Sequence, residues 1–335
     1  MSDHSLLVIG CGSIGERHVR CFQNTGRTRV VACDTDAALL QRVMATYHVT
    51  AVSDWKREID SGKHNMVLVA TPAHLHVAMA LYALEHRVHV MVEKPLAPSI
   101  SGIAELQRAQ TSSRCKAAVA YVYRVFPFLR DAHDFVREGT VGAIRQIVYV
   151  GGQPFHKLRP EYARTYYNNR ATGGGAIQDA LTHLANWVES LVGPTNSVLC
   201  DCAHLVLPSV TVEDTVHVSA RNGDVLVNYS LNQFQNPNEA ILLINGTRGS
   251  VRIEFHHQRW GALCEGDKTW NWRQPAPAER DTHFIAQANA FVDLVEGKPS
   301  RLCTLDEAIA TLRFNLAALA SSESAGRINC ASFIP

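Results

Sequence analysis

The sequence predicts an α/β protein, with a doubly wound parallel sheet in its first half and an α+β domain in its second. Apolar strands alternate with helices from residue 5 to 120, a pattern that places consecutive strands parallel in one sheet. After residue 197, strands of alternating apolar and polar residues follow one another across short turns, as in an antiparallel sheet. We therefore expect two domains, 1–122 and 123–335.

The first half contains six expected strands, and its apolar strands are typical of a sheet buried on both faces. The expected strands are 5–9, 28–33, 50–52, 65–70, 88–92 and 115–120, and the expected helices are 16–24, 36–47, 74–85 and 99–111. Ligands of such sheets bind beyond the carboxyl ends of the strands. Gly10, Asp34, Thr71, Glu93 and Tyr121 stand at those ends.

A glycine-rich turn follows the first strand and opens a helix. Gly10, Gly12 and Gly15 form GxGxxG, in which the glycines allow a tight turn, a close approach of pyrophosphate, and close helix packing. The helix start also offers N–H groups to phosphates. Asp34 ends the second strand, where an acid binds ribose hydroxyls, and neither Lys nor Arg follows at once to receive a 2′-phosphate. The sequence predicts a Rossmann domain that binds NAD, with NADP less favoured.

Lys94 follows the fifth expected strand, between Glu93 and Pro95. A lysine at such a position could simply be solvated. At the rim of this sheet, however, its ammonium could hold a substrate hydroxyl or stabilise it as the proton leaves. The Lys94–Pro95 peptide is a candidate for the cis form.

A second glycine-rich segment, Gly173–Gly175, precedes a helix in the second half. Asp179 and His183 are four residues apart, so they stack on one face and can hydrogen-bond. A carboxylate beside an imidazole prepares a general base for work near neutral pH. The opposite face carries an apolar stripe, Ile177, Leu181, Leu184, Val188 and Leu191. An ordinary amphipathic helix with its polar face in water is the alternative.

The segment 153–172 is expected to be a long polar and aromatic loop, rich in Tyr, Arg and Asn. Because it leads into the triple glycine, we interpret it as the substrate-side wall of a cleft; a solvated loop or a subunit contact is the alternative. Further expected strands are 143–151, 197–203, 210–220, 224–232, 239–245 and 250–254, and further expected helices are 126–139, 282–296 and 305–322. The strands after 197 are expected to form an antiparallel meander with one face covered by helices. The other face could be covered by another subunit, so we expect a homodimer or homotetramer.

The composition argues against several classes of partner. A net charge of +1 with interspersed charges favours neither nucleic acid nor an anionic membrane. We find no signal peptide and no membrane-length apolar segment, and the nine cysteines without a CxxC pair indicate reduced thiols in the cytoplasm. No metal is expected, because His256-His257 and His74-x-His76 lack a third ligand at a recognisable spacing.

Taken together, these motifs resemble the Gfo/Idh/MocA oxidoreductases, the glucose–fructose oxidoreductase and inositol dehydrogenase group. The resemblance covers nearly the whole chain. It rests on GxGxxG, Glu93-Lys94-Pro95, Gly-Gly-Gly-x-x-x-Asp-x-x-x-His, Ala70-Thr71-Pro72, the helix with His76, AYVYRVFP at 120–127 and the helix of Asp306-Glu307-Ala308. It implies an N-terminal Rossmann domain and a C-terminal domain with a large, mostly antiparallel open sheet.

The resemblance also implies roles for particular residues. Lys94 matches the family's catalytic or substrate-binding lysine, and Asp179 and His183 match its catalytic acid–base pair. The expected cofactor-binding residues are Gly10, Gly12, Ser13, Ile14, Gly15, Asp34, Thr71, Pro72, His76, Glu93 and Lys94. The expected substrate-binding residues are Tyr123, Arg124, Arg159, Tyr166, Asp179 and His183.

The expected reaction is hydride transfer between NAD and a secondary alcohol carbon of a sugar, polyol or sugar derivative. His183 would take the hydroxyl proton, Asp179 would orient His183, and Lys94 would stabilise the developing alkoxide. One alternative is a glycosidase-like enzyme that oxidises a sugar transiently, eliminates a substituent and reduces the sugar again. The other is a non-catalytic NAD(H) sensor, which the presence of these three residues disfavours.

Overall fold

The computed structural model describes residues 4–276 and 278–334, which pack as two compact units, each with its own sheet. The first unit takes in the described residues up to Val125 together with Ala278–Ala308. The second takes in residues 126–276 and Ile309–Ile334. The chain therefore returns to the first unit late in the sequence, a return that a linear division at residue 122 does not include.

The sheet of the first unit has seven strands in the order β15-β6-β5-β4-β1-β2-β3. Every pairing is parallel except that of β15 with β6, which confirms the predicted Rossmann fold. Its strands are β1 (His4–Ile9), β2 (Thr28–Cys33), β3 (Thr50–Val52), β4 (Met66–Val69), β5 (His89–Val92), β6 (Ala117–Val119) and β15 (Cys303–Thr304). The strand order reverses beside β1, and ligands of doubly wound sheets bind at this reversal.

The helices of the first unit include one that returns from late in the chain. They are α1 (Ser13–Asn24), α2 (Ala37–Tyr47), α3 (Trp55–Asp60), α4 (His76–Glu85), α5 (Ile103–Ser113) and α9 (Arg280–Val295). The short helix α3 was not expected; Asp54 caps it by accepting from two backbone N–H groups. Helix α9 packs on α1, where Phe22 meets Phe291 edge to face at 6.4 Å.

The sheet of the second unit has nine strands in the order β14-β13-β12-β11-β7-β10-β9-β8-β16. Its strands are β7 (Ile144–Gly152), β8 (Ser197–Ala203), β9 (Thr215–Asn222), β10 (Val225–Asn232), β11 (Glu239–Gly246), β12 (Gly249–Glu254), β13 (Arg259–Cys264), β14 (Asn271–Arg273) and β16 (Ile328–Asn329). The prediction of one continuous meander is wrong, because β7 inserts between β10 and β11 and pairs parallel with β10. A parallel neighbour needs a long crossover, which the residues between β7 and β10 supply. The sheet is otherwise antiparallel, as predicted.

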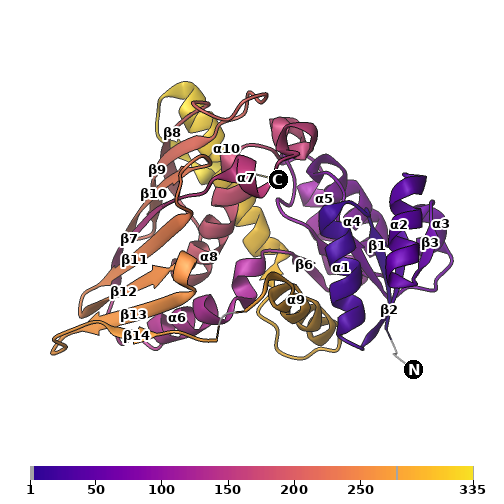
Figure 1. Cartoon of the computed structure of the whole chain (residues 1–335), viewed down its shortest axis with the longest axis horizontal. Helices are drawn as coiled ribbons and strands as arrows, with labels where there is room; N and C mark the ends of the chain where they lie inside the picture. The colour runs from indigo at the N-terminus through magenta and orange to yellow at the C-terminus, as the bar shows by residue number, and fades with distance from the viewer. Residues whose placement is uncertain (1–3, 277, 335) are drawn as a thin grey trace. The chain divides into compact units, whose positions relative to one another are not determined.

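The two faces of this sheet differ. Helices α8 (Thr182–Val192) and α10 (Leu305–Ser324) lie along one face (Figure 1). The side chains of Val216, Val218 and Val227 are buried there, as expected, and Tyr229 meets Phe314 of α10 at 5.8 Å. Helix α6 (Pro127–Arg137) packs on β12 and β13 at the other end of the sheet. The outward-pointing side chains of the same strands are partly exposed.

The segment 153–172 is folded rather than an open loop. It forms α7 (Phe155–Leu158) and the 3-10 turns Tyr162–Arg164, Tyr166–Asn168 and Arg170–Thr172. Its rings build a small core whose members are Phe155, Tyr162, Tyr167, Leu207, Val210 and Val212. Tyr162 and Tyr167, two tyrosines of the segment expected to form a cleft wall, are therefore structural. Burial of their large rings stabilises the fold of the segment.

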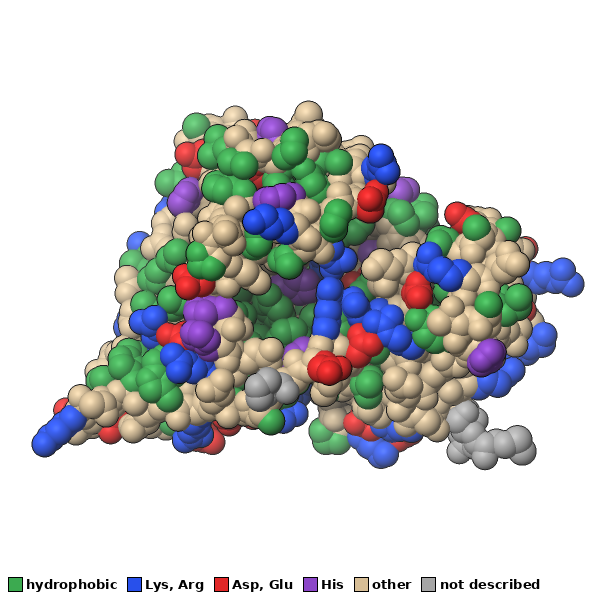
Figure 2. Space-filling view, in the orientation of Figure 1, with side chains coloured by type: hydrophobic (Ala, Val, Ile, Leu, Met, Phe, Trp, Pro, Cys, Tyr) green, Lys and Arg blue, Asp and Glu red, His purple; other side chains and the backbone are tan. Residues whose placement is uncertain are grey.

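The surface matches the balanced composition. On the face shown in Figure 2, basic and acidic side chains are interspersed. Among the described helices, none is long and apolar enough to cross a membrane.

Candidate active site

In the glycine turn after β1, two of the three glycines are in close contact with backbone atoms and the third faces open space. Gly10 has φ of +97°, and a Cβ there would lie 2.6 Å from the Ala70 carbonyl oxygen. A Cβ on Gly15 would overlap the Gly10 carbonyl, whereas a Cβ on Gly12 would meet nothing within 4 Å. Gly12 precedes α1, whose first N–H groups have no partner within the helix. An open backbone approach at a helix N-terminus fits a dinucleotide diphosphate.

Asp34 is fixed beside this turn at the carboxyl end of β2. Its Oδ2 accepts the Cys11 N–H at 2.6 Å, and its Oδ1 accepts the Asp36 N–H at 2.9 Å. A carboxylate accepts up to about four hydrogen bonds, so capacity remains for ribose hydroxyls. The exposed Asp36 next to it adds negative charge, which disfavours a 2′-phosphate.

The Glu93-Lys94-Pro95 segment is held from two helices. The buried Glu93 carboxylate contacts His18 of α1 at 2.6 Å and also accepts the Lys94 N–H at 3.0 Å. Burial raises the pKa of Glu93, but hydrogen bonding to His18 and the charge of Lys94 outweigh it, and the pKa lies below its ordinary value. Lys94–Pro95 is cis, as the sequence suggested. One carboxylate oxygen of Glu93 thus contacts α1, and the other accepts a hydrogen bond from the backbone of the segment.

His76, an expected cofactor-binding residue, is 1% exposed and links two loops. Its Nε2 lies 2.7 Å from the Thr71 carbonyl oxygen and its Nδ1 lies 3.0 Å from the Pro95 carbonyl oxygen. Burial lowers the pKa of the ring. The structure therefore places His76 behind the rim, joining the loop after β4 to the loop after β5. Pro72 directly precedes the 3-10 turn Ala73–Leu75 in the first of these loops.

Two of the expected substrate-binding residues lie in the 3-10 turn Val122–Val125 of the first unit. Both terminal nitrogens of Arg124 lie 3.0 Å from a Glu307 carboxylate oxygen at the start of α10, and the Arg124 side chain is 10% exposed. Tyr123 is half-buried beside it. Arg124 is thus committed to an ion pair within its own unit.

The expected catalytic helix of the second unit begins with a π turn, Ile177–Leu181, before α8. π turns inside helices are frequent at functional sites. The π turn changes the helical phase between Asp179 and His183, so the hydrogen bond expected from α-helical spacing stays a prediction. Both side chains are partly buried.

Glu213, which the sequence analysis did not single out, anchors the start of this helix. Its carboxylate is 1% exposed, accepts the Ile177 N–H at 3.1 Å and pairs with Arg170 at 2.9 Å. Its backbone carbonyl accepts the Ala176 N–H at 3.0 Å. A negative charge at a helix N-terminus is stabilising. The signal available in the sequence was a pair of acids, Glu213 and Asp214, set among the valines and threonines of VTVEDTV.

The triple glycine makes room for this anchor. A Cβ on Gly175, which has φ of +91°, would overlap the Glu213 carboxylate. A Cβ on Gly174 would overlap the carbonyl of Tyr167. The glycines therefore allow Glu213 and the Tyr167 backbone to approach the helix start.

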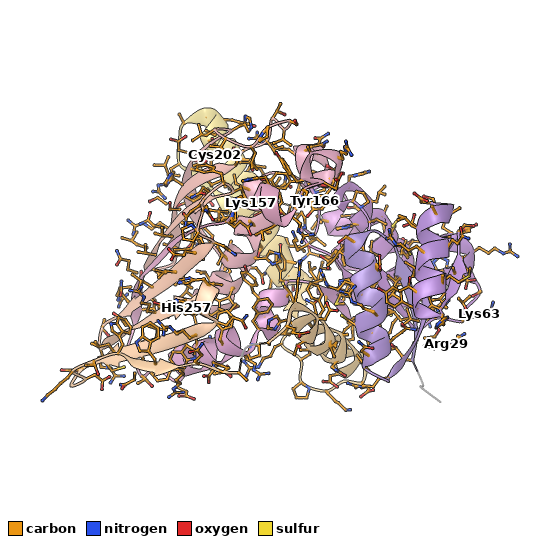
Figure 3. All side chains as sticks on the ribbon, in the orientation of Figure 1. Arg29, Lys63, Lys157, Tyr166, Cys202 and His257 are labelled. Carbon is orange, nitrogen blue, oxygen red and sulfur yellow. The ribbon has the colours of Figure 1, made fainter. Side chains whose placement is uncertain are left out.

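Tyr166, labelled in Figure 3, donates from its hydroxyl to Asp179 Oδ1 at 2.6 Å. Its side chain is 42% exposed, in contrast to the buried Tyr167 next to it. Arg159, from the same segment, is exposed. Of the expected substrate-binding residues, the structure joins Tyr166 and Asp179 by this hydrogen bond.

Beyond His183, polar side chains of α8 are buried instead of solvent-exposed. The buried Asn186 donates to Thr311 of α10 at 3.0 Å, and Thr311 donates to the buried Glu189 at 2.6 Å. The alternative of an ordinary helix with a solvated polar face is therefore wrong for this part.

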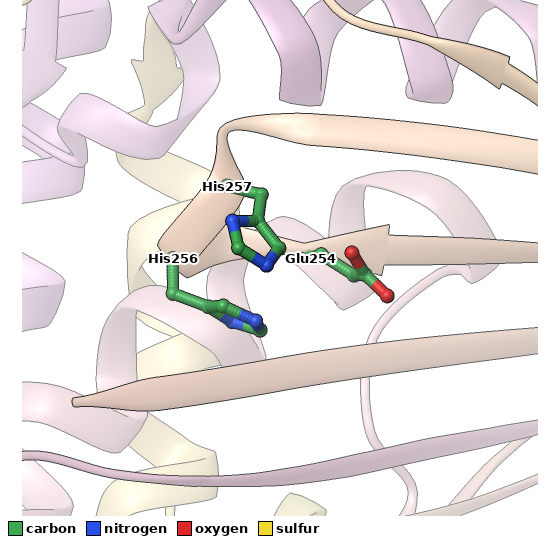
Figure 4. Close-up of side chains that lie close together, drawn as sticks. All are labelled: Glu254, His256 and His257. Carbon is green, nitrogen blue, oxygen red and sulfur yellow. The ribbon is translucent and has the colours of Figure 1, made fainter. Parts of the chain in front are cut away.

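In the structure, a possible third metal ligand, Glu254, lies beside the pair His256-His257. Glu254, His256 and His257 hold ligand atoms within 4.8 Å of one another (Figure 4). The Glu254 carboxylate, however, accepts from Arg252 at 2.9 Å and from Arg259 at 2.7 Å. Two guanidinium groups on the only carboxylate of the cluster oppose a cation there.

Comparison with known proteins identifies the class of this protein. The Gfo/Idh/MocA oxidoreductase family model with an NAD-binding Rossmann fold matches residues 5–121. The Gfo/Idh/MocA C-terminal domain matches residues 129–252. The chain therefore belongs to the Gfo/Idh/MocA family, and it is an NAD-binding oxidoreductase.

Individual relatives are distant. Levoglucosan dehydrogenase of Pseudarthrobacter phenanthrenivorans is 29% identical over 44% of this chain but only 38% of its own length. Rhizopine catabolism protein MocA of Rhizobium meliloti is 23% identical over 93% of both chains. A solved structure of levoglucosan dehydrogenase with NADH and levoglucosan superposes with a TM-score of 0.89 at 19% identity, covering 98% of this chain and 99% of that one.

Proposed function

We propose that this oxidoreductase transfers a hydride between NAD and a secondary alcohol carbon of a sugar, polyol or sugar derivative. The observation that carries the proposal is the anchored helix of the second unit. It presents Asp179, hydrogen-bonded to Tyr166, and the family's histidine, His183, one turn later. The relatives whose names mention levoglucosan support the substrate class.

In the proposed reaction, each residue has a distinct task. His183 takes the proton of the substrate hydroxyl, and Asp179 stabilises the charged imidazole that results. Lys94 stabilises the negative charge that develops on the substrate oxygen. NAD, when bound, supplies the hydride acceptor. Gly12 and the start of α1 hold its diphosphate, and Asp34 holds the adenosine ribose.

The first test is a panel of levoglucosan, inositols, aldoses and sugar acids with NAD or NADP, followed by NADH or NADPH formation. We expect reduction of NAD by at least one member and a preference for NAD over NADP of about tenfold or more, because Asp34 and Asp36 repel a 2′-phosphate. A preference for NADP would contradict the role of Asp34.

The second test removes the proposed catalytic groups. Lys94→Ala and His183→Ala should each lower kcat by about 10²- to 10⁴-fold, because each removes a proton-transfer or charge-stabilising group. The affinity for NADH, measured by fluorescence titration, should stay within about twofold, since neither side chain belongs to the diphosphate-binding turn. Lys63→Ala and His257→Ala, both exposed, are the controls. Unchanged turnover in both catalytic variants would refute the assignment.

A reaction without net oxidation remains a second candidate, because one relative, 24% identical over 82% of this chain, is named 2,7-anhydro-N-acetylneuraminate hydratase. Transient oxidation followed by elimination would convert the substrate without accumulating NADH. Product analysis by mass spectrometry, run beside the NADH assay, separates the two reactions. A protein that binds NADH but converts no panel member would instead support the sensor alternative.

We further propose that the protein is a homo-oligomer through the outer face of its nine-stranded sheet. Across four strands this face carries Val148, Asn228, Ser219 and Leu199 in one row and Val150, Ser230, His217 and Asp201 in the next. Val150 is 55% exposed and Leu199 is 42% exposed, and together these residues line a hollow. A second copy of the same face would cover Val148, Val150 and Leu199, apolar side chains that water otherwise reaches.

The thiols support a reducing compartment, and we propose the cytoplasm. All nine cysteines are free. Burial raises the pKa of Cys11 and Cys33 to about 12, so these thiols are inert.

A further inference from the structure

His18 lies in α1, one turn past the glycine-rich loop, and it is fully buried. Its Nε2 stands 2.6 Å from Glu93 Oε1, and because an ionised carboxylate only accepts, this nitrogen donates. The other side of the ring packs on Phe284 of α9, edge to face at 5.5 Å, and on Phe22 at 6.3 Å. A hydrogen bond between buried groups in apolar surroundings fixes both partners strongly.

The second carboxylate oxygen of Glu93 contacts the backbone of Lys94. Glu93 Oε2 accepts the backbone N–H of Lys94 at 3.0 Å. On the far side of the motif, the Pro95 carbonyl contacts His76 at 3.0 Å. Helix α1 and helix α4 therefore hold the segment that carries Lys94 from its two ends, through His18 with Glu93 and through His76.

We propose that His18 is a positioning residue for Lys94, acting through the Glu93 carboxylate that it shares with the Lys94 backbone. The inference rests on the proposed function, in which Lys94 stabilises the substrate oxygen. It also couples two parts of one domain, since the helix that begins at the diphosphate-binding turn also orients the loop that carries the lysine. An error of about 1 Å in a catalytic group costs on the order of 10²-fold in rate.

Loss of the His18 donor changes the pKa of Glu93 in a definite direction. Without a donor at position 18, burial of Glu93 is no longer opposed by that hydrogen bond, so its pKa rises and the carboxyl takes up a proton at a higher pH. The groups that act on Glu93 are His18 from α1, His76 from α4 and Lys94 in its own loop, while α9 contributes the apolar Phe284 behind His18. A protonated Glu93 holds the Lys94 N–H less firmly.

The experiment compares His18→Leu, which removes the donor, with His18→Gln, which keeps an N–H group. The panel sugar that wild type turns over fastest is the substrate. His18→Leu should lower kcat by about tenfold or more, with NADH affinity within about twofold, and should move the acidic limb of the kcat profile to higher pH. His18→Gln should recover most of the rate. A thermal melt of each variant separates misfolding from mispositioning.

A substrate-independent measurement keeps the two proposals apart. Acetic anhydride labels amines, and peptide mass spectrometry reports Lys94 relative to Lys63 and Lys116 of the same unit. In folded His18→Leu the segment that carries Lys94 is held less firmly, so Lys94 should be labelled about threefold faster relative to these lysines, and in His18→Gln it should match wild type. Equal Lys94 labelling and equal kcat in His18→Leu would overturn the positioning role. Full turnover in Lys94→Ala, together with faster labelling of Lys94 in His18→Leu, would instead overturn the catalytic role of Lys94 and leave the positioning role of His18 standing.

Discussion

At the scale of single residues, several side chains of the proposed site are held by hydrogen bonds within the protein. Glu213 shows how local sequence serves this end: its carboxylate satisfies the first N–H of the π turn, and Gly175 is glycine because a Cβ would occupy the same space. Preorganised groups lose little freedom during the reaction, which is why such contacts raise rates. Tyr166 is the exposed member of this arrangement, and we expect it to contact the substrate.

Removing the Tyr166 hydroxyl tests this reading. Tyr166→Phe should lower kcat by about tenfold, because a hydrogen bond to a charged group contributes about 1.5–3 kcal/mol. Tyr82→Phe is a matched control, since Tyr82 also donates to an aspartate, Asp60, at 2.6 Å on the first unit. Steady-state kinetics on the best panel sugar is the measurement. A loss of equal size in the control would show that the effect is general and not tied to Asp179.

At the scale of elements, α9 and α1 show how a distant segment completes the first unit. Asp281 of α9 accepts from Arg17 at 3.0 Å and from Arg20 at 2.8 Å on α1. The hydrogen bonds from Arg20 and then Arg17 lower the pKa of Asp281 against the opposing effect of burial. Because its pKa is depressed in the fold, Asp281 stabilises the protein above the ordinary carboxylate range and loses that contribution as pH falls through its lowered value.

Asp281→Asn should therefore reduce the free energy of unfolding by about 1 kcal/mol at pH 7, the scale of a partly exposed ion-pair network. The difference from wild type should shrink as pH falls from 5 toward about 3. Chemical denaturation at several pH values measures it. Asp224→Asn is the control, since Asp224 is 90% exposed and its ion pair with Arg145 is 3.4 Å long, so no change is expected. A difference that is independent of pH would contradict an electrostatic origin.

At the scale of the whole molecule, the outer face of the nine-stranded sheet sets the expected assembly. Val150→Asp should convert the oligomer to monomers, because two-fold symmetry would bring a new charge near its own copy. Leu205→Asp, on an equally exposed residue outside the strands, should leave assembly unchanged. Analytical ultracentrifugation at micromolar concentration gives the masses. A wild-type protein that sediments as a monomer would refute the proposed interface.

The sequence alone determined the parallel sheet, the dinucleotide turn and the glycine-rich start of the proposed catalytic helix. These features depend on local periodicity and on backbone conformations that only glycine adopts easily, and both are visible in a short window of residues. Only the tertiary structure decided that β7 lies between β10 and β11, that residues 278–308 belong with the first unit, and that Glu213 and His18 hold the two motifs. These facts depend on contacts between residues far apart in the chain, where sequence spacing carries no information about which buried partner a polar group will find.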